Sequence, residues 1–212
     1  FFFSFRRGYI WALSTAYRTN YFNKFMTEQK SINSDAYWDS RFEENWETFA
    51  GPAQSRFFSR LAIDHLPRWL INELKKKELT LADWGCAQGD GTDVWSAYLD
   101  AEQLSGIDFS EVAIKQAQQR YPAIKFLCED WLDASSSSDQ QTFDVVFSSN
   151  TLEHFHQPYP VLNAIALRAD KAVVLALPYK ELDRIDEHFY TFLADNIPLT
   201  LGNGFRFCWA KA

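Results

Sequence analysis

The sequence predicts a doubly wound α/β protein with a mostly parallel sheet and helices on both faces. From residue 79 to residue 177, short apolar segments alternate with helical patterns. The apolar segments are hydrophobic throughout rather than at every second position, as in parallel strands covered on both sides. The chain has 212 residues, a length that favours one domain with a large core.

Two helices are expected before the first strand. Gly51-Pro52 places a proline at a helix start, and apolar residues then recur with a period of 3.6. Pro67 should interrupt this pattern and give helices over about 53–65 and 67–77.

Five strands and three further helices follow. The expected strands are 79–83, 104–108, 124–128, 143–147 and 172–177. The expected helices are 92–99, the segment from the capping residue Ser110 to Arg120, and 158–169. In such a sheet, ligands bind beyond the carboxyl ends of the strands.

Composition excludes several classes of function. The net charge of −7 and the pI of about 5.1 argue against a nucleic-acid partner. No apolar run approaches the roughly 18 residues of a membrane-spanning helix. Three widely spaced cysteines form neither a disulfide framework nor a zinc cluster, so a reducing, cytoplasmic location is expected. The oligomeric state is not readable from the sequence.

Residues 1–30 differ from the rest of the chain. They are rich in aromatic residues and carry five basic residues against one acid, a net of +4. They make a poor signal peptide because the arginines follow the apolar start. We expect a tail or fragment outside the fold, with a basic surface helix as the alternative, and one domain over residues 31–212.

A glycine-rich segment joins the first strand to the next helix. It contains the residues Asp83, Gly85, Cys86, Ala87, Gly89 and Gly91. Glycines there allow a tight turn and a close approach of the backbone to a ligand. The dinucleotide pattern G-x-G-x-x-G fails, and no Gly-Lys-Ser/Thr sequence is present. An acid before the turn suits a ligand that has an amino group and no phosphate.

This segment resembles motif I of the class I S-adenosylmethionine-dependent methyltransferases, acid-x-Gly-x-Gly-x-Gly. Ala87 replaces the middle glycine. The resemblance covers the chain from about residue 37 to its end and implies a Rossmann-like fold, an antiparallel C-terminal strand and S-adenosylmethionine as cofactor. The residues of the glycine-rich segment would then bind the cofactor.

Two further acids follow the next two strands. Asp108 ends the second strand, where a carboxylate can accept hydrogen bonds from both ribose hydroxyls, although a helix-capping role competes. Phe109 would flank the adenine. The resemblance implies that Asp130 accepts a hydrogen bond from the adenine amino group, and that Trp131 packs against the other side of the ring.

The segment after the fourth strand contains Asn150 and the sequence Leu-Glu-His. In methyltransferases that it resembles, this loop lies beneath the methionine part of the cofactor and faces the acceptor. The segment from Tyr37 to Arg41 is similar to leader segments that fold over the cofactor. Arg41 would meet the cofactor carboxylate, or else form a surface ion pair.

A hydroxyl acceptor needs a base near neutral pH, and histidine is suited to that role. His154 and His188 are the candidates because each follows the carboxyl end of a strand. A structural role for each histidine stays open. Glu153, His154 and His156 alone are a weak metal signal, so we expect no metal.

The favoured function is methyl transfer to a hydroxyl of a small-molecule or glycan acceptor. The alternatives are a methyltransferase acting on RNA or protein and a non-catalytic S-adenosylmethionine-binding domain. Acidity disfavours RNA, and the acids Asp83, Asp108 and Asp130 disfavour a degenerate site.

The end of the chain suggests a truncated sheet. Residues 188–194 are expected to form a short helix and Phe205–Ala210 a sixth strand, with the seventh strand missing. Pro198 argues against a central strand over 197–201. The last predicted strands should then leave an unpaired edge.

Overall fold

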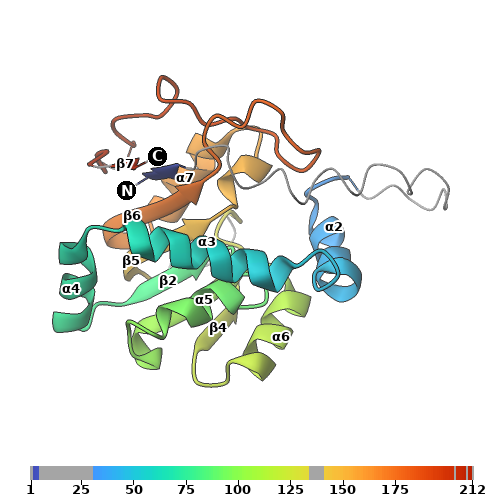
Figure 1. Cartoon of the computed structure of the whole chain (residues 1–212), viewed down its shortest axis with the longest axis horizontal. Coiled ribbons are helices and arrows are strands. Elements are labelled where there is room, and N and C mark those ends of the chain that lie inside the picture. The colour runs from blue at the N-terminus through green and yellow to red at the C-terminus, as the bar shows by residue number, and fades with distance from the viewer. Residues whose placement is uncertain (1, 5–30, 134–140, 203, 209, 212) are drawn as a thin grey trace.

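The computed structural model describes residues 2–4, 31–133, 141–202, 204–208 and 210–211. Its centre is a seven-stranded sheet in the order β4-β3-β2-β5-β6-β1-β7, and every strand pairing is parallel (Figure 1). The strands are β1 (Phe2–Ser4), β2 (Leu81–Trp84), β3 (Leu104–Asp108), β4 (Lys125–Cys128), β5 (Phe143–Ser149), β6 (Ala169–Leu177) and β7 (Ala210–Lys211). The predicted fold class is confirmed.

The α-helices are α2 (Asp35–Ser40), α3 (Gly51–His65), α4 (Arg68–Lys76), α5 (Asp90–Trp95), α6 (Glu111–Arg120) and α7 (Pro158–Ala166). Shorter helical segments are η1 (Arg41–Asn45), η2 (Ala101–Gln103) and η3 (Leu152–His154). Pro52 lies in the first turn of α3, and Pro67 separates α3 from α4, as expected. Ser110 caps α6 by accepting a hydrogen bond from the backbone N–H of Ala113.

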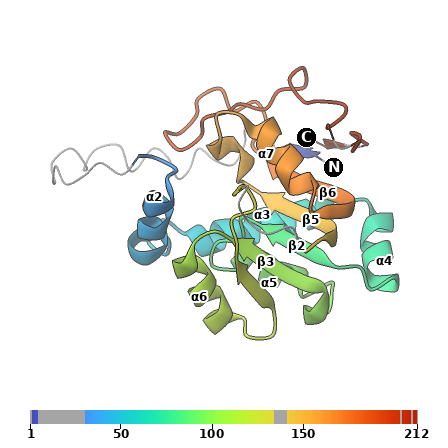
Figure 2. The ribbon, with the colours of Figure 1, turned by 180° about the vertical axis from the view of Figure 1, so that it is seen from behind.

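Two hydrophobic layers sandwich the sheet. One layer contains residues of α3, α4, α5 and α6, with Trp95 at its centre against Phe147. The other contains α7, represented by Leu162 and Ile165, together with aromatic residues of the C-terminal segment. Figure 1 shows α3 and α5 in front of the sheet, and Figure 2 shows α7 on the opposite side.

The order in which strands are added to the sheet reverses between β2 and β5. From β2 the chain proceeds outward through β3 to β4, whereas β5 returns to the other side of β2 and leads to β6. Ligands of open α/β sheets bind at such a point, beyond the carboxyl ends of the strands. The loops after β2 and β5 meet there, because a Cβ atom at Gly85 would lie 2.6 Å from Thr151 Oγ1.

The C-terminal segment differs from the sequence prediction. Residues 188–194 form no helix, and Phe205–Ala210 do not form a sixth strand. Thr200 and Arg206 instead form an isolated antiparallel bridge, and Leu199 and Leu201 are hydrogen-bonded to Phe207 and Phe205. The antiparallel C-terminal strand is not confirmed, since β7 runs parallel to β1.

The N-terminus also enters the sheet. Residues 2–4 form β1, which pairs with β6 and β7, so β6 is not the unpaired edge expected from the sequence. Segment 197–201 does not supply the seventh strand; β1 does. The remainder of the predicted tail, residues 5–30, lies outside the described residues, and the boundary at residue 30 stays a prediction.

Candidate active site

The glycine-rich loop after β2 has a left-handed backbone at three positions. Gly85 has φ +77°, Ala87 has φ +49° and Gly89 has φ +82°. Glycine adopts such angles readily, whereas alanine is strained by them. The loop therefore has the backbone of a three-glycine turn although Ala87 occupies its middle position.

Two residues of this motif are explained by packing. Cys86 is buried, and its thiol lies near the position that a Cβ atom at Gly106 would occupy, 2.9 Å away. A Cβ atom at Gly91 would lie 2.7 Å from Ser59 Oγ, so Gly91 allows α5 to approach α3 closely. Both residues thus have a packing role in the structure, and their part in cofactor binding stays a prediction.

Asp83 is buried beneath the loop. Its carboxylate accepts a hydrogen bond from Thr92 Oγ1 at 2.7 Å. Burial raises the pKa of Asp83 to about 7, and the charge of Asp108 raises it further while the hydrogen bond opposes the shift. A cationic ligand group placed beside this carboxyl group would favour its ionised form.

Asp108, at the end of β3, connects the glycine-rich loop to α6. One carboxylate oxygen accepts from the Ala87 N–H at 2.9 Å and the other from the Ser110 N–H at 3.0 Å. Burial raises the pKa of Asp108 to about 6, against the effect of these bonds. A carboxylate has about four acceptor positions, so one position on each oxygen remains for a ligand hydroxyl.

The adenine residues do not form the expected pair. Phe109 is 38% exposed at the carboxyl end of the sheet, but Trp131 is only 5% exposed. The indole of Trp131 stacks on Phe143, with the Arg168 guanidinium 5.1 Å from its ring centre. Trp131 therefore packs in the core in this structure, and its position beside the adenine ring stays a prediction. Asp130 is exposed and accepts from the Leu132 N–H.

The leader helix α2 connects the two loops that follow β3 and β5. Asp39 accepts a hydrogen bond at 2.6 Å from Ser110 Oγ, beside Asp108. The adjacent Trp38 packs edge-on against the ring of His154, with 5.0 Å between ring centres. Consecutive residues of α2 thus contact the neighbourhood of Asp108 and the Leu-Glu-His segment.

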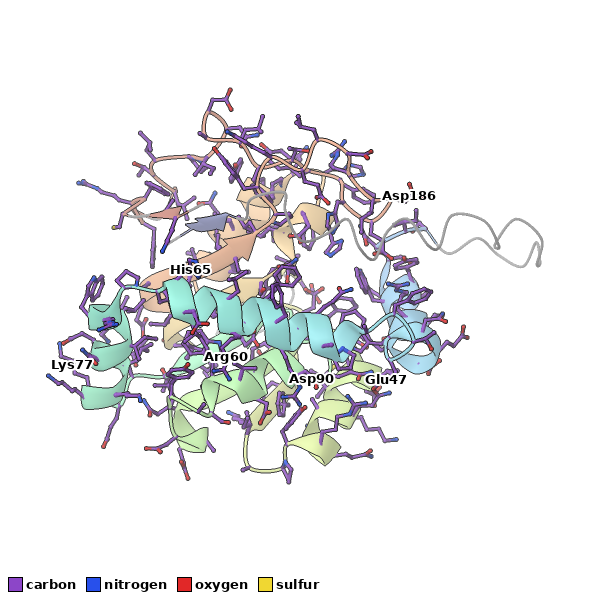
Figure 3. The ribbon with its side chains drawn as sticks, in the orientation of Figure 1. Glu47, Arg60, His65, Lys77, Asp90 and Asp186 are labelled. Atoms are coloured by element: carbon purple, nitrogen blue, oxygen red, sulfur yellow. The ribbon has the colours of Figure 1, made fainter. Side chains whose placement is uncertain are left out.

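Arg41 forms an ion pair with Glu187 at 3.4 Å, and Tyr37 donates a hydrogen bond to the same carboxylate. Of the two roles expected for Arg41, the ion pair is the one observed. Figure 3 shows the neighbouring Asp186 above α2, on the loop that follows β6. Asn150, directly after β5, has a left-handed backbone and donates its N–H to the Ala176 carbonyl.

Glu153, His154 and His188 come together beyond β5 and β6. The rings of His154 and His188 are 5.1 Å apart, and His188 Nε2 lies 4.0 Å from Glu153 Oε1. Burial lowers the pKa of His154 to about 4, although the carbonyls of Glu187 and Asn150 oppose the shift. Such a ring is neutral at pH 7, and it is a weaker base than the sequence analysis expected.

His188 has the opposite electrostatic environment. Burial disfavours its charge, but the hydrogen bond with Glu181 and the charge of Glu153 outweigh burial and raise its pKa. His188 Nδ1 lies 2.6 Å from Glu181 Oε2. Burial raises the pKa of Glu153 to about 7, while the charge of His188 opposes this shift.

Sequence reasoning missed the residues that hold this cluster. Glu181 and Glu187 lie in an irregular loop after β6, and Asn33 precedes α2. The Asn33 side-chain amide donates to the backbone carbonyls of His154 and Glu187, at 3.2 and 2.7 Å. No periodicity marks these positions, and the partners of Asn33 lie more than 100 residues away in the sequence.

A comparison with protein-family models identifies the central part of the chain. Residues 81–168 match the model of a family described as a methyltransferase domain. The match begins at β2 and includes the glycine-rich loop, Asp108 and the Leu-Glu-His segment. This match agrees with the resemblance of motif I to the class I S-adenosylmethionine-dependent methyltransferases, a class whose cofactor is S-adenosylmethionine. No match was found among the curated proteins.

Several solved methyltransferase structures match part of this chain. They include a chain of the complex between the Haloferax volcanii Trm112 methyltransferase activator and a methyltransferase (18% identity, TM-score 0.49) and Streptomyces venezuelae DesVI (15%, 0.49). The matches cover 63% and 68% of this chain but only 55% and 60% of those chains. Synechocystis magnesium protoporphyrin IX methyltransferase, crystallised with S-adenosylmethionine, matches at 16% identity over 69% of this chain and 77% of its own, with a TM-score of 0.47.

Among the described residues, no helix combines the length and apolar character needed to cross a membrane.

Proposed function

We propose that the protein transfers a methyl group from S-adenosylmethionine to a hydroxyl group of a small-molecule or glycan acceptor. One observation carries this proposal. The glycine-rich loop, with Asp83 and Asp108 beside it, adjoins the loop that contains Glu153 and His154. The two loops meet between β2 and β5, where the order of strands in the sheet reverses. One loop suits the cofactor and the other suits an acceptor that must lose a proton.

In the proposed complex, Asp108 holds the ribose and Phe109 flanks the adenine. Asp83 attracts the amino group of the methionine part, because a cation there favours the ionised carboxylate. Asp130, exposed at the end of β4, is proposed to accept from the adenine amino group. Close alignment of acceptor and methyl carbon supplies much of the catalysis, roughly 7–11 kcal/mol in well-oriented systems.

The preference for a hydroxyl acceptor rests on the cluster of Glu153, His154 and His188. An alcohol is a poor nucleophile until its proton is removed or its oxygen is polarised, and a cluster of acid and imidazole groups can provide either effect. The net charge of −7 disfavours an RNA acceptor.

The test is a methyl-transfer assay with labelled S-adenosylmethionine and separate pools of hydroxyl acceptors: sugars, nucleotide sugars and phenols. We expect labelled methyl ethers from at least one pool, none with Asp108→Ala, and stabilisation of the protein by S-adenosylhomocysteine. At 100 times its dissociation constant, a ligand stabilises by about 2.7 kcal/mol. Stabilisation by NAD instead, or labelled product only from RNA or protein, would refute the proposal.

A further inference from the structure

Three side chains from two distant segments converge beside the proposed acceptor position. Glu153 and His154 belong to η3, and His188 belongs to the loop after β6. One nitrogen or oxygen atom from each of the three lies within 4.8 Å of the other two. His156, the other histidine of the segment, is not part of this group, because its exposed ring stacks on Phe189.

The Glu153 carboxyl group is buried and lacks a hydrogen-bond partner among the described residues. The residue is 0% exposed, and neither carboxylate oxygen has a hydrogen-bond partner among the described residues. Its nearest cationic neighbour, His188 Nε2, is 4.0 Å away, beyond hydrogen-bond distance. Buried carboxylates are normally paired or coordinate a metal, since an unpaired one is costly. Both carboxylate oxygens are therefore available to a further ligand.

The two imidazole rings are held through the same nitrogen. His154 Nδ1 is bonded to the Glu187 carbonyl at 2.9 Å, and His188 Nδ1 is bonded to the Glu181 carboxylate at 2.6 Å. In a neutral ring, a proton on Nδ1 leaves the lone pair on Nε2. Metal-ligating histidines are typically oriented in this way, with the second nitrogen bonded to a carboxylate or a carbonyl.

We propose that Glu153, His154 and His188 bind one divalent transition-metal ion, with Zn²⁺ the best match to the donor set. Two imidazole nitrogens and one carboxylate oxygen are a three-ligand set of catalytic zinc sites, which leaves a position for a fourth ligand. The ion supplies the positive charge that the buried Glu153 lacks. It replaces the sequence-based expectation of no metal, which considered His156 rather than His188.

The chemical role of this metal site rests on the proposed function. In that role, the acceptor hydroxyl group occupies the fourth coordination position of the ion. Coordination to zinc lowers the pKa of a bound hydroxyl group, so its proton passes to water near neutral pH. The oxygen then forms a bond to the methyl carbon, and the carbon–sulfur bond breaks with its electron pair going to sulfur. The products are a methyl ether and neutral S-adenosylhomocysteine.

The first experiment measures metal binding without catalysis. Full-length protein is stripped with a chelator and titrated with ZnCl₂, and with MgCl₂ as the comparison, by calorimetry and thermal denaturation. We expect one Zn²⁺ per chain and a higher melting temperature with zinc. Co²⁺ should give a spectrum of nitrogen and oxygen ligation; a thiolate charge-transfer band would assign the metal to cysteines and overturn the proposal.

Variants then test the ligand set. Glu153→Gln should weaken zinc binding at least 100-fold and leave S-adenosylhomocysteine binding unchanged, because its volume is preserved and the cofactor loop is untouched. Glu181→Gln should weaken zinc binding 10- to 100-fold through the orientation of His188. His156→Gln is the matched control and should bind zinc like the unchanged protein.

The outcomes separate the two proposals. Zinc bound equally by the unchanged protein and by Glu153→Gln, or no zinc bound at one equivalent, overturns the metal site. In the second case the cluster is an ion-paired acid–imidazole group. Stoichiometric zinc binding without any binding of S-adenosylhomocysteine leaves the metal site in place and refutes the proposed methyl transfer.

Discussion

The cofactor loop and the acceptor-side cluster are built in opposite ways. Beside the cofactor loop, the buried acids have hydrogen-bond partners: Asp83 accepts from Thr92 Oγ1, and Asp108 accepts from the backbone N–H of Ala87. In the cluster, Glu153 and His188 come from distant segments, and the Glu153 carboxyl group has no hydrogen-bond partner among the described residues. The acids of the first region are hydrogen-bonded within the protein, whereas the second region has the side chains of a metal-binding site.

The largest expected effect tests the cofactor side. Asp108→Ala removes two charge-assisted hydrogen bonds to the ribose, each about 1.5–3 kcal/mol, so affinity for S-adenosylhomocysteine should fall more than about 100-fold. Calorimetry measures the change, and Asp108→Asn, which keeps one acceptor oxygen, should fall between. A loss below tenfold would show that Asp108 does not hold the ribose.

Substitutions of Trp131 and Phe109 distinguish a core residue from a cofactor-binding residue. Trp131→Ala should lower the free energy of unfolding by roughly 3–5 kcal/mol, because the indole packs against Phe143 in the core. Phe109→Ala should barely affect stability but weaken cofactor binding by about 1 kcal/mol. Denaturant unfolding and calorimetry on both variants provide the test, and the reverse pattern would restore Trp131 to the adenine site.

Asp83 makes the stability of the ligand-free protein depend on pH. Its folded pKa, about 7, lies above its ordinary value because of burial. Its contribution to stability is fully present below about pH 4 and is lost as the pH rises through 7. Asp83→Asn should therefore raise the free energy of unfolding at pH 8.5 by about 2–4 kcal/mol and flatten the pH profile.

The same substitution should weaken cofactor binding, because the carboxylate that attracts the methionine amino group is gone. Thermal denaturation between pH 4 and pH 8.5, with and without S-adenosylhomocysteine, measures both effects. A profile that keeps its slope in Asp83→Asn would assign the titration to another group, with Asp108 the next candidate because its pKa is also raised.

Asn33 tests how the acceptor-side cluster is held. Asn33→Gly keeps the left-handed backbone of this residue, φ +65°, but removes both hydrogen bonds to the carbonyls of His154 and Glu187. We expect a loss of about 1–2 kcal/mol of stability and no change in cofactor affinity. A parallel loss of cofactor binding would show that the two regions are coupled through α2.

The smallest effect concerns Ala87. Ala87→Gly relieves a left-handed alanine at φ +49° but increases the freedom of the unfolded chain. The net gain in stability should be below about 1 kcal/mol, with the hydrogen bond from this N–H to Asp108 retained. Chemical denaturation resolves the difference, and a destabilised variant would show that the Ala87 methyl group packs favourably.

The sequence by itself determined the strand–loop–helix units. Strand β3 has the predicted bounds, and β2, β4, β5 and β6 differ by a few residues, because continuous apolar runs and the flanking Ser110 and Pro67 act locally. The glycine-rich loop was located for the same reason. Its acid, turn and helix are consecutive, so spacing alone predicts their arrangement.

Tertiary structure decided what depends on long-range contacts. The family resemblance places Trp131 beside the adenine ring, whereas in the structure its indole packs in the core against Phe143. The C-terminal segment was expected to form a strand, yet β1 pairs with β6 in its place. His188 joins Glu153 only because the loop after β6 returns over β5, and an irregular loop has no periodicity from which its path could be predicted.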